Sequence, residues 1–523
     1  MNFNNKLIKG GYNELSNSEI IPYNNSKNSI DNNNNLSSIV RIIAYNVDYD
    51  WYSPFKTSHD YESVGTGFFI DNNGTILTCS HVVEDAIKIV ITIPSEGKDK
   101  LDAELISICP TCDLAIIKVK NYNSKNFLKL GNSDNVKQRD AVMAVGYPLG
   151  QDRLKYSGGI ISGLQGSLFQ TDAPINPGNS GGPLISNATN EVIGVNSQKI
   201  AANQADNIGY SIPIYNFIIM KDIMINPKNK VIKKPNLITG FQNSDEYSLK
   251  ILEIPQNDMC KNGYHVNKVF KNTSFYNSGI RKGDIICSFN NYNVDNHGEC
   301  TVDFNSEKVH IKDLLFRFNI GDIIPISYWS NLEKKIIKND LVFLENPFKI
   351  IRKFPSIQKQ PDFEIIAGIV IMNLTVNHLI NMENSSFPMK KHRELSKYVE
   401  PKNRINNKLI ISNILPGSYV KTIENLCSGD TIKSINNKKI NNLTDFRKYI
   451  INNIVSDKNN NKYITFETDS DSIIFLDIKK VIEEDKFLSD RYKFKNTIIH
   501  NNLSNIIKNK KLPNNYPIKY HPR

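Results

Sequence analysis

The chain of 523 residues has no apolar run long enough to cross a bilayer as a helix. Its N-terminal stretch, MNFNNKLIKGGYNELSNSEI, has no apolar core of the kind that a secretory signal requires. Cysteine is scarce, with only seven residues, an odd number for a disulfide framework. From these absences we expect an intracellular protein, cytoplasmic or nuclear, with reduced cysteines and no membrane partner.

Positive charge is in excess but is not concentrated. The formal net charge is +11, yet no long block of Lys and Arg occurs. A nucleic-acid-binding surface needs clustered basic residues, so we expect no nucleic-acid partner. The apolar share of 40% and the charged share of 22% are ordinary for globular proteins. At this length the sequence predicts several domains rather than one core.

Composition divides the chain into segments. Residues 1–37 are polar and rich in Asn, which predicts a disordered leader. Residues 38–225 contain many short β-type runs separated by Gly, Asn and Asp, which predicts a β-barrel or sandwich domain closed by an apolar helix. Residues 226–235 combine proline and charge without periodicity, and this is typical of a linker.

The second half contains an internal repeat. The pattern Gly-Asp-x-Ile-x-Ser-x-Asn-Asn occurs once from Gly283 and again from Gly429. In each copy an aliphatic strand precedes the pattern and an apolar segment of helical spacing follows it. The repeat predicts two related modules, at 236–348 and 349–523, the second divergent and carrying a C-terminal extension.

The segment TDAPINPGNSGGPL places Ser180 between glycines in a turn, which is typical of an exposed nucleophile. A hydroxyl nucleophile needs a histidine base and a carboxylate that orients the base. The candidates are His81, after the strand-like TILTCS, and Asp113, before LAIIKV. The N–H groups of Gly178 and Ser180 are the candidate oxyanion hole. The G-x-S-x-G elbow of α/β-hydrolases is excluded, because a β-type run follows Pro183 and both partners precede the serine.

Seven motifs in order resemble the protease domain of the HtrA/Deg family: TILTCSHVV, CDLAIIKV, AVGYPLG, SGGIISGL, QTDAPINPGNSGGPL, IGVNS and NIGYSIPI. GYPLG and the Gly-Gly-Ile-Ile-Ser that follows are similar to plant-type Deg proteases. The resemblance implies a mainly β multidomain protein with a chymotrypsin-like pair of six-stranded barrels, and a triad of His81, Asp113 and Ser180. It also implies an ATP-independent serine endopeptidase of unfolded or damaged proteins, without metal or cofactor, assembled as a trimer or multiple of trimers.

The same resemblance gives an expectation for specificity. It assigns the primary substrate pocket to Pro174, six residues before the nucleophile, and to Asn196 and Ser197 of the IGVNS motif. Because Pro174 is not acidic, we expect no preference for cleavage after Lys or Arg. A small or medium apolar side chain is favoured. Asn179 stands where digestive relatives carry Asp, so activation by N-terminal clipping is not expected.

The two modules resemble PDZ domains, since GIRKGDIICSFNN is similar to the PDZ pattern of Gly-Leu-x-x-Gly-Asp-x-Ile. Such domains bind a protein C-terminus as an added strand and hold its carboxylate with backbone N–H groups. The candidate capture loops are Thr239-Gly240-Phe241 and Ala367-Gly368-Ile369, each with a glycine before an apolar residue. The second module has a longer insertion, and assembly is an alternative role for it.

Two alternatives stay open. Cys109-Pro-Thr-Cys112 abuts Asp113 and is open to structural, metal or redox interpretations. Zinc would need two further ligands with suitable spacing, and a redox motif normally has a βαβ context that is missing here. For the whole chain, the alternative is a non-catalytic chaperone or PDZ scaffold that keeps the protease fold.

Overall fold

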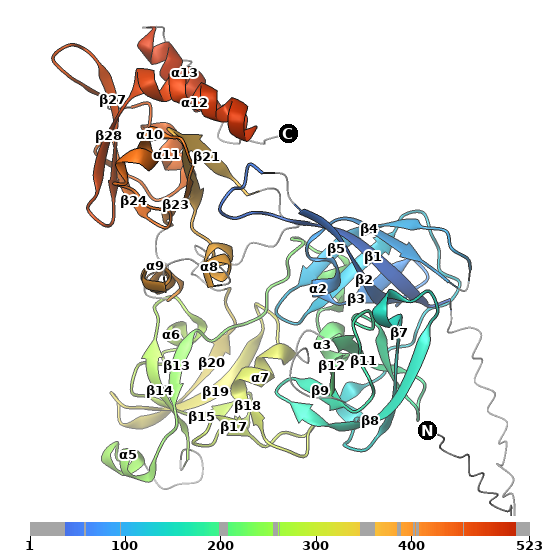
Figure 1. The fold of residues 1–523 in the computed structure, drawn as a ribbon. Coiled ribbons are helices and arrows are strands. Elements are labelled where there is room, and N and C mark those ends of the chain that lie inside the picture. Colours follow the sequence, from blue (N-terminus) through green and yellow to red (C-terminus); the bar gives the residue numbers. More distant parts are fainter. Residues whose placement is uncertain are drawn as a thin grey trace, which may run out of the picture.

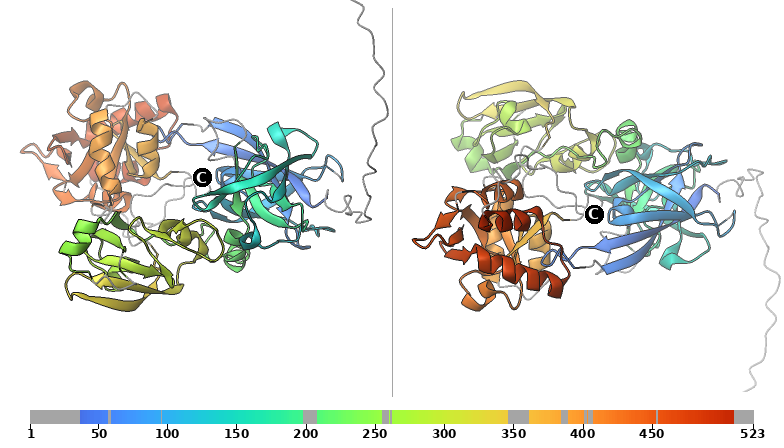
Figure 2. Two further views of the ribbon diagram at one scale, coloured as in Figure 1. Left: turned by 90° about the horizontal axis from the view of Figure 1, so that it is seen from below. Right: turned by 90° about the horizontal axis from the view of Figure 1, so that it is seen from above.

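The structure, a computed structural model, describes residues 37–508 apart from 57–58, 95, 198–207, 255–259, 261, 346–360, 384–388, 401–402, 404–406 and 453. The predicted leader therefore lies outside the described residues, except for its last position. Colour follows the sequence in Figure 1: two β-barrels run from blue to green, a first module from green to yellow and a second from orange to red. Figure 2 shows the two modules side by side, next to the barrels.

The first barrel is a closed ring of six strands in the order β1-β2-β3-β6-β5-β4. Ile and Val, whose branched side chains suit a pleated surface, fill much of its interior. Closure leaves no strand edge exposed. The strands are β1 (Ile39–Asp48), β2 (His59–Phe69), β3 (Thr75–Thr78), β4 (Ala86–Thr92), β5 (Leu101–Cys109) and β6 (Leu114–Val119).

The second barrel is also closed, in the order β10-β11-β12-β9-β8-β7, so the predicted pair of six-stranded barrels is confirmed. Two 3₁₀ turns flank β7. The elements are η1 (Ser133–Asn135), β7 (Ala141–Gly146), η2 (Pro148–Gly150), β8 (Lys155–Gln165), β9 (Leu168–Thr171), β10 (Pro183–Ser186), β11 (Val192–Ser197) and β12 (Gly209–Pro213).

The end of the barrel domain returns to the first barrel. The predicted apolar helix is divided into α3 (Tyr215–Ile218) and α4 (Lys221–Ile225), whose buried residues join the first barrel's core. The predicted linker at 226–235 is not a loose connection, because Val231 bridges in parallel to Ile108 of β5. The backbone N–H of Ile108 donates to the Lys230 carbonyl at 2.7 Å. The segment leading to the first module is thus fixed to the barrel.

The first module is built on a sheet in the order β13-β14-β15-β19-β20, with β13 at one edge. Phe275, Phe289 and Ile326 are among the buried residues of its core. The strands are β13 (Thr239–Gln242), β14 (Tyr264–Val269), β15 (Ile285–Phe289), β16 (Tyr292–Asn293), β17 (Glu299–Cys300), β18 (Val309–His310), β19 (Ile323–Ser330) and β20 (Lys335–Val342). The helical segments are α5 (Glu246–Ile251), α6 (Ser274–Asn277), α7 (Ile311–Leu314) and η3 (Leu315–Arg317).

The second module has a sheet in the order β21-β22-β23-β24-β27-β26 and more helices. The strands are β21 (Phe363–Ile366), β22 (Ile369–Asn373), β23 (Leu409–Ile414), β24 (Thr431–Ile435), β25 (Lys438–Lys439), β26 (Val455–Ser456), β27 (Lys462–Thr468) and β28 (Ile473–Asp477). The helical segments are α8 (Val376–Glu383), α9 (Met389–Ser396), η4 (Lys397–Val399), α10 (Tyr419–Ile423), α11 (Leu443–Tyr449), α12 (Ile478–Tyr492) and α13 (Ile498–Ile507).

The repeated Gly-Asp pattern has the same backbone in both modules. Gly283 and Gly429 have φ values of 95° and 92°, a left-handed conformation that favours glycine. The carboxylates of Asp284 and Asp430 each accept a hydrogen bond from the N–H three residues earlier, at 2.7 and 2.8 Å. Both Asn-Asn pairs have positive φ at each residue, as a tight hairpin turn requires. The repeat seen in the sequence is therefore a structural repeat.

Each module also touches the barrels. In the first module, Arg317 forms an ion pair with Asp134 at 2.5 Å and lies over the rings of Tyr215 and Phe304, at 3.8 Å from each. In the second module, Trp51 from the loop between β1 and β2 is buried within a cluster that includes Met372 of β22. An ion pair with aromatic stacking in the first module and an aromatic cluster in the second therefore hold both modules against the barrels.

Two observations bear on the expected setting. Cys260 and Cys287 form a disulfide, so the expectation that all cysteines are reduced is wrong for this pair, whose Cα atoms lie 4.6 Å apart.

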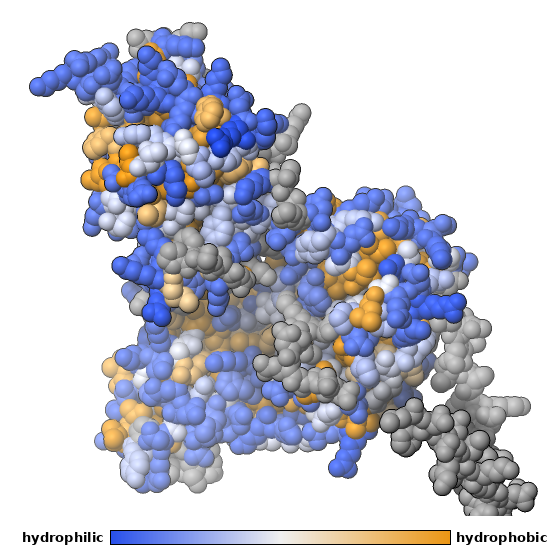
Figure 3. Space-filling view, viewed as in Figure 1, coloured by the Kyte–Doolittle hydropathy of each residue, from blue (hydrophilic) through white to orange (hydrophobic). Residues whose placement is uncertain are grey.

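Among the described helices, none has the length and apolar character of a membrane-spanning helix. Figure 3 shows that hydrophilic residues cover most of one face, with smaller hydrophobic areas over the barrels and the second module.

Candidate active site

His81 and Asp113 are held together by several hydrogen bonds. His81 lies in the single turn α2 (Ser80–Val83) directly after β3, and Asp113 lies in the turn before β6. The imidazole Nδ1 lies 2.8 Å and 3.0 Å from the two carboxylate oxygens, and the His81 backbone N–H donates to Oδ1 at 3.0 Å. This arrangement places the proton on Nδ1 and leaves Nε2 as the basic nitrogen.

Asp113 is itself fixed on three sides. Its backbone has φ of 55°, an uncommon conformation for a residue with a side chain, and its carbonyl accepts the N–H of Ser80 at 3.1 Å. The Ser197 hydroxyl donates to Oδ2 at 2.8 Å. Strain of this kind persists only where the surroundings determine it, and it concentrates at functional sites. The carboxylate is thus positioned to orient one imidazole.

Cys79 is a buried neighbour of this pair. Its sulfur, one imidazole nitrogen of His81 and a carboxylate oxygen of Asp113 lie within 4.8 Å of one another. Burial and the Asp113 carboxylate raise the pKa of the Cys79 thiol well above its ordinary value. A protonated thiol is a poor metal ligand and a poor nucleophile. We therefore interpret Cys79 as a packing residue behind the base.

The turn that carries Ser180 lies against the strand end that leads to His81. The Ser180 carbonyl accepts the N–H of Thr66 at 2.9 Å, and Gly181 donates to the Asn196 carbonyl at 2.8 Å. Gly181 has φ of 86°, and a Cβ there would collide with the Thr66 carbonyl and the Thr78 hydroxyl. Only glycine permits this approach. The two barrels thus bring the serine turn and the histidine turn to one place.

The contacts around Gly178 fix the direction of its backbone N–H group. Its φ is 95°, and an added Cβ would collide with the Tyr147 carbonyl. The Pro177 carbonyl accepts the Leu149 N–H at 2.5 Å, and the chain has no cis peptide bond in the described residues. In a trans peptide the N–H points opposite to the carbonyl. The Gly178 N–H therefore points away from Leu149, and its carbonyl is held by the Thr66 hydroxyl at 2.7 Å.

The three residues assigned to the substrate pocket are placed differently. Pro174 is exposed. Asn196 and Ser197 are 0% and 1% exposed, and the Asn196 amide is engaged by the Pro183 carbonyl and the Ser211 hydroxyl, both at 3.0 Å. The side chains of Asn196 and Ser197 thus support the site from inside instead of lining open space. Sequence reasoning missed the bond from Ser197 to Asp113, because it joins residues 84 positions apart.

Comparisons with known proteins agree with this geometry. The family model described as "Trypsin-like peptidase domain" matches residues 65–195, and the model described as "PDZ domain" matches residues 353–498. The chain thus combines a trypsin-like peptidase domain with a PDZ domain and is similar to curated proteases of the HtrA/Deg family.

Two curated members illustrate the relationship. "Serine protease Do-like HtrB" of Bacillus subtilis is 32% identical over 43% of this chain and 52% of its own length. "Protease Do-like 2, chloroplastic" of Arabidopsis thaliana is 27% identical over 84% of this chain and 71% of its own length. The chain thus spans about half of the first of these relatives. Among solved structures, "HtrA-type protease AlgWS227A with decapeptide" is 21% identical, with a TM-score of 0.47 over 60% of this chain and 96% of that chain.

In the first PDZ-like module the predicted capture loop lies within β13, two residues later than the corresponding loop of the second module. Thr239, Gly240 and Phe241 belong to β13 and pair with β14, with a register shift between Gly240 and Phe241. The second module has its shift between Val370 and Ile371, so Gly240 corresponds to Val370. The structural equivalent of Ala367-Gly368 is therefore Leu237-Ile238. Ile238 has φ of 48°, which is a strained conformation for a β-branched residue.

The capture loop of the second module is already occupied. The N–H groups of Ala367 and Gly368 donate to the two carboxylate oxygens of Asp485 on α12, at 3.0 and 3.2 Å. Asp485 is 0% exposed and also lies 3.0 Å from Nε2 of His500. The loop does hold a carboxylate, as its sequence predicts, but the carboxylate comes from the same chain.

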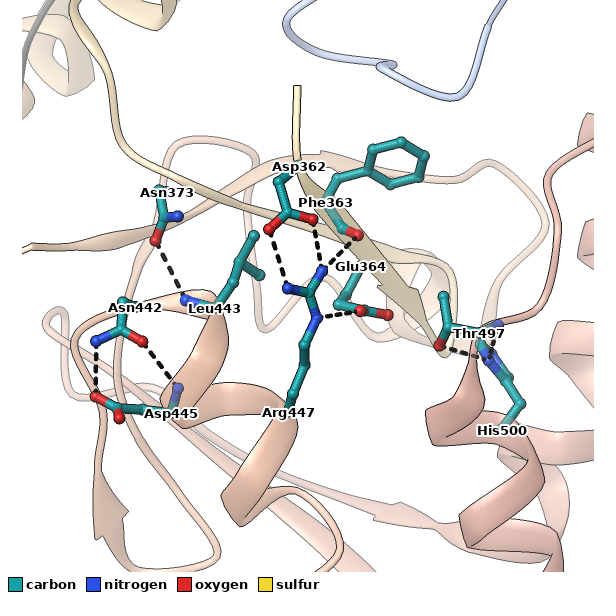
Figure 4. Close-up of polar contacts among 10 residues, drawn as sticks. All are labelled: Asp362, Phe363, Glu364, Asn373, Asn442, Leu443, Asp445, Arg447, Thr497 and His500. Atoms are coloured by element: carbon teal, nitrogen blue, oxygen red, sulfur yellow. Dashed lines mark hydrogen bonds and ion pairs between the residues drawn. The ribbon is translucent and has the colours of Figure 1, made fainter. Parts of the chain in front are cut away.

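The strand edge beside that loop is occupied as well. β21 pairs with β22 as a hairpin, on the side of β22 opposite to β23. Figure 4 shows Arg447 of α11 reaching β21. Its guanidinium binds both oxygens of Asp362 at 2.6 and 2.9 Å and Glu364 at 2.6 Å. A peptide cannot be added at β22 while β21 is there, so Ala367, Gly368 and Ile369 do not form an open peptide site in this structure.

Proposed function

We propose that this HtrA/Deg-like protein is an ATP-independent serine endopeptidase that hydrolyses peptide bonds of unfolded or damaged proteins. The observation that carries the proposal is the hydrogen-bonded pair of His81 and Asp113, whose geometry leaves Nε2 as the base. The serine turn packed against the same strand end supports Ser180 as the nucleophile. The family's curated members are named as serine proteases, which agrees with this assignment.

The roles follow from the geometry. Ser180 attacks the scissile carbonyl while Nε2 of His81 takes the hydroxyl proton, and Asp113 stabilises the resulting imidazolium. The N–H groups of Gly178 and Ser180 would stabilise the oxyanion, each contributing about 3–4 kcal/mol by analogy with measured donors. His81 then gives its proton to the leaving amine, and water completes hydrolysis of the acyl-enzyme by the reverse path.

Digestion of casein by the wild type and by Ser180→Ala tests the proposal. We expect the substitution to lower kcat by at least about 10³-fold, because the residual rate comes only from binding and the oxyanion hole. Labelling by a fluorophosphonate, which reacts with activated serines, should disappear in the same variant. If the wild type neither cleaves casein nor takes the label, the non-catalytic chaperone or scaffold is the correct interpretation.

For partners, we propose that the first module receives protein C-termini at the free edge of β13, with the loop at Leu237–Ile238 facing the terminal carboxylate. The occupied loop and edge of the second module favour an assembly role for it. A homo-oligomer built from trimers is part of the proposal, and light scattering on a sizing column tests it. An intracellular location is the remaining part, and cell fractionation with an antibody against the protein tests it.

A further inference from the structure

Cys109 and Cys112 begin and end the tight turn between β5 and β6. The backbone N–H of Cys112 donates to the Cys109 carbonyl at 3.1 Å, which defines a four-residue β-turn. Pro110, at the second position, has the φ that such a turn needs. The ends of a β-turn lie less than about 7 Å apart at their Cα atoms, and this is within the range that a disulfide spans.

The two thiols are free and act on each other. Neither cysteine is bonded to another, whereas Cys260 and Cys287 in the first module are. Contact with the Cys112 thiol lowers the pKa of Cys109, and the buried Lys234 ammonium acts in the same direction. The pKa of Cys112 is raised, chiefly by the same contact. The two thiols are therefore in contact with each other, beside a buried ammonium that favours a thiolate.

A pocket gives small molecules access to this turn. Its volume is about 290 Å³, and Cys112, Asp113, Ser197 and Phe316 are among the residues that line it. Cys112 is 4% exposed and lines this pocket, whereas Cys109 is 0% exposed. A volume of about 290 Å³ admits a molecule as small as hydrogen peroxide.

We propose that Cys109 and Cys112 form a modification site, where a small peroxide closes a disulfide that displaces Asp113 and lowers activity. One of the two cysteines, as its thiolate, attacks one peroxide oxygen, giving a sulfenic acid and one water once the released hydroxide is protonated. The other thiol then attacks the sulfenic sulfur and expels the second oxygen as water. The two thiols together lose two electrons, and these reduce one peroxide to two waters.

Asp113 is sensitive to this closure because it is the next residue along the chain. A disulfide brings the two sulfurs to about 2.05 Å, so the side chains of both cysteines and the backbone that carries them must adjust to the bond. Asp113 holds a strained φ of 55°, and its carboxylate must meet His81 and Ser197 simultaneously. A misplacement near 1 Å at a catalytic site costs about 10²-fold in rate. We expect kcat to fall at least about tenfold, with little change in KM because Asp113 does not contact the substrate.

The modification can be measured independently of activity. No Lys or Arg lies between Leu101 and Ile117, so trypsin releases both cysteines in one peptide that ends at Lys118. Disulfide closure lowers the mass of this peptide by two hydrogens and blocks its alkylation. The experiment treats the full-length protein with hydrogen peroxide and follows this peptide, casein cleavage and fluorophosphonate labelling, before and after dithiothreitol. The loss of activity rests on the proposed function, whereas the mass change does not.

The matched variant is Cys109→Ala with Cys112→Ala, and the control is Cys427→Ala at an exposed free cysteine. We expect peroxide to close the disulfide and lower kcat in the wild type and in the control, and dithiothreitol to restore both. The double variant should keep its activity under peroxide. The proposal is overturned if the peptide stays reduced, if closure leaves kcat unchanged, or if the double variant is inactivated to the same extent. If the reduced protein is inactive before peroxide is added and the disulfide still closes afterwards, the result would instead contradict the proposed protease function.

Discussion

The two PDZ-like modules share a backbone but differ in what is left open. Both carry the Gly-Asp turn with the same carboxylate-to-backbone hydrogen bond, at 2.7 and 2.8 Å. In the first module the sheet ends at β13, whereas in the second β21 covers the equivalent strand. In the second module Asp485 also occupies the carboxylate loop. The repeat therefore determines the frame of the module, and segments outside the repeat determine whether it can bind a ligand.

Among the substitutions that test the difference between the two modules, Asp485→Ala should have the largest effect. The change leaves two backbone N–H groups and His500 without their buried acceptor, and breaking such an arrangement costs about 3–5 kcal/mol. Hydrogen exchange at Ala367 and Gly368 should accelerate strongly. Asp490→Asn, an exposed position on the same helix, is the control. Unchanged protection of both amides in Asp485→Ala would show that the internal carboxylate does not close the loop.

A somewhat smaller effect is expected from Arg447→Ala, which releases β21. Glu364 is 2% exposed and loses its cationic partner, so we expect a loss of about 2–4 kcal/mol in the stability of the second module at pH 8. Arg447→Lys should not restore this stability, because one ammonium cannot bind Asp362 and Glu364 in the same bidentate way. Denaturant unfolding monitored by exchange at β21 and β22 measures the loss.

The same variant has a predicted pH dependence. Burial raises the pKa of Glu364, with Arg447 opposing that shift, so removing Arg447 raises the pKa further. A raised folded pKa means that the folded module binds the proton more tightly than the unfolded chain. The associated stability is present at acid pH and is lost as pH rises through the folded pKa. Arg447→Ala should therefore be less destabilised at pH 5 than at pH 8, and an equal loss at both would contradict the assignment.

The smallest effects on stability are expected from single substitutions at the left-handed position of each loop. Gly368→Ala should destabilise the second module by about 1–3 kcal/mol, because its φ is 72° and a Cβ would collide with Ser418. Ile238→Gly should stabilise the first module by about 1 kcal/mol, because it removes a strained φ of 48°. A fluorescent peptide with a free C-terminal carboxylate should bind to the first module in both the Gly368→Ala and the Ile238→Gly variants, as fluorescence titration would show. Binding only after Asp485→Ala would assign the peptide to the second module instead.

The parts that sequence predicted have local signatures. Short β-type runs predicted a β-barrel or sandwich domain, and the resemblance to HtrA/Deg proteases supplied the pair of barrels. The Ser180 turn follows from glycines that must adopt φ of 95° and 86° at Gly178 and Gly181. Such a requirement appears in the sequence as glycine itself. The Gly-Asp repeat was predictable for the same reason, since its left-handed turn recurs in both modules.

The missed features join residues that are distant in sequence. Ala367 and Asp485 are 118 positions apart, and neither type of residue alone indicates the other. In the first module Ile238 occupies the left-handed position that Gly368 takes in the second, so the glycine pattern pointed to Gly240, two residues further on. The disulfide of Cys260 and Cys287 likewise depends on packing of a helix and a sheet, which the spacing of the two cysteines does not reveal.

The central claim is that Asp113 holds His81 in the tautomer that serves Ser180. Steady-state kinetics of casein-peptide cleavage by Asp113→Asn tests it most directly. An amide in place of the carboxylate keeps the shape but favours the wrong tautomer, so we predict a fall in kcat of about 10⁴-fold with KM nearly unchanged. A variant that retains wild-type kcat would show that His81 works without this partner and would contradict the account.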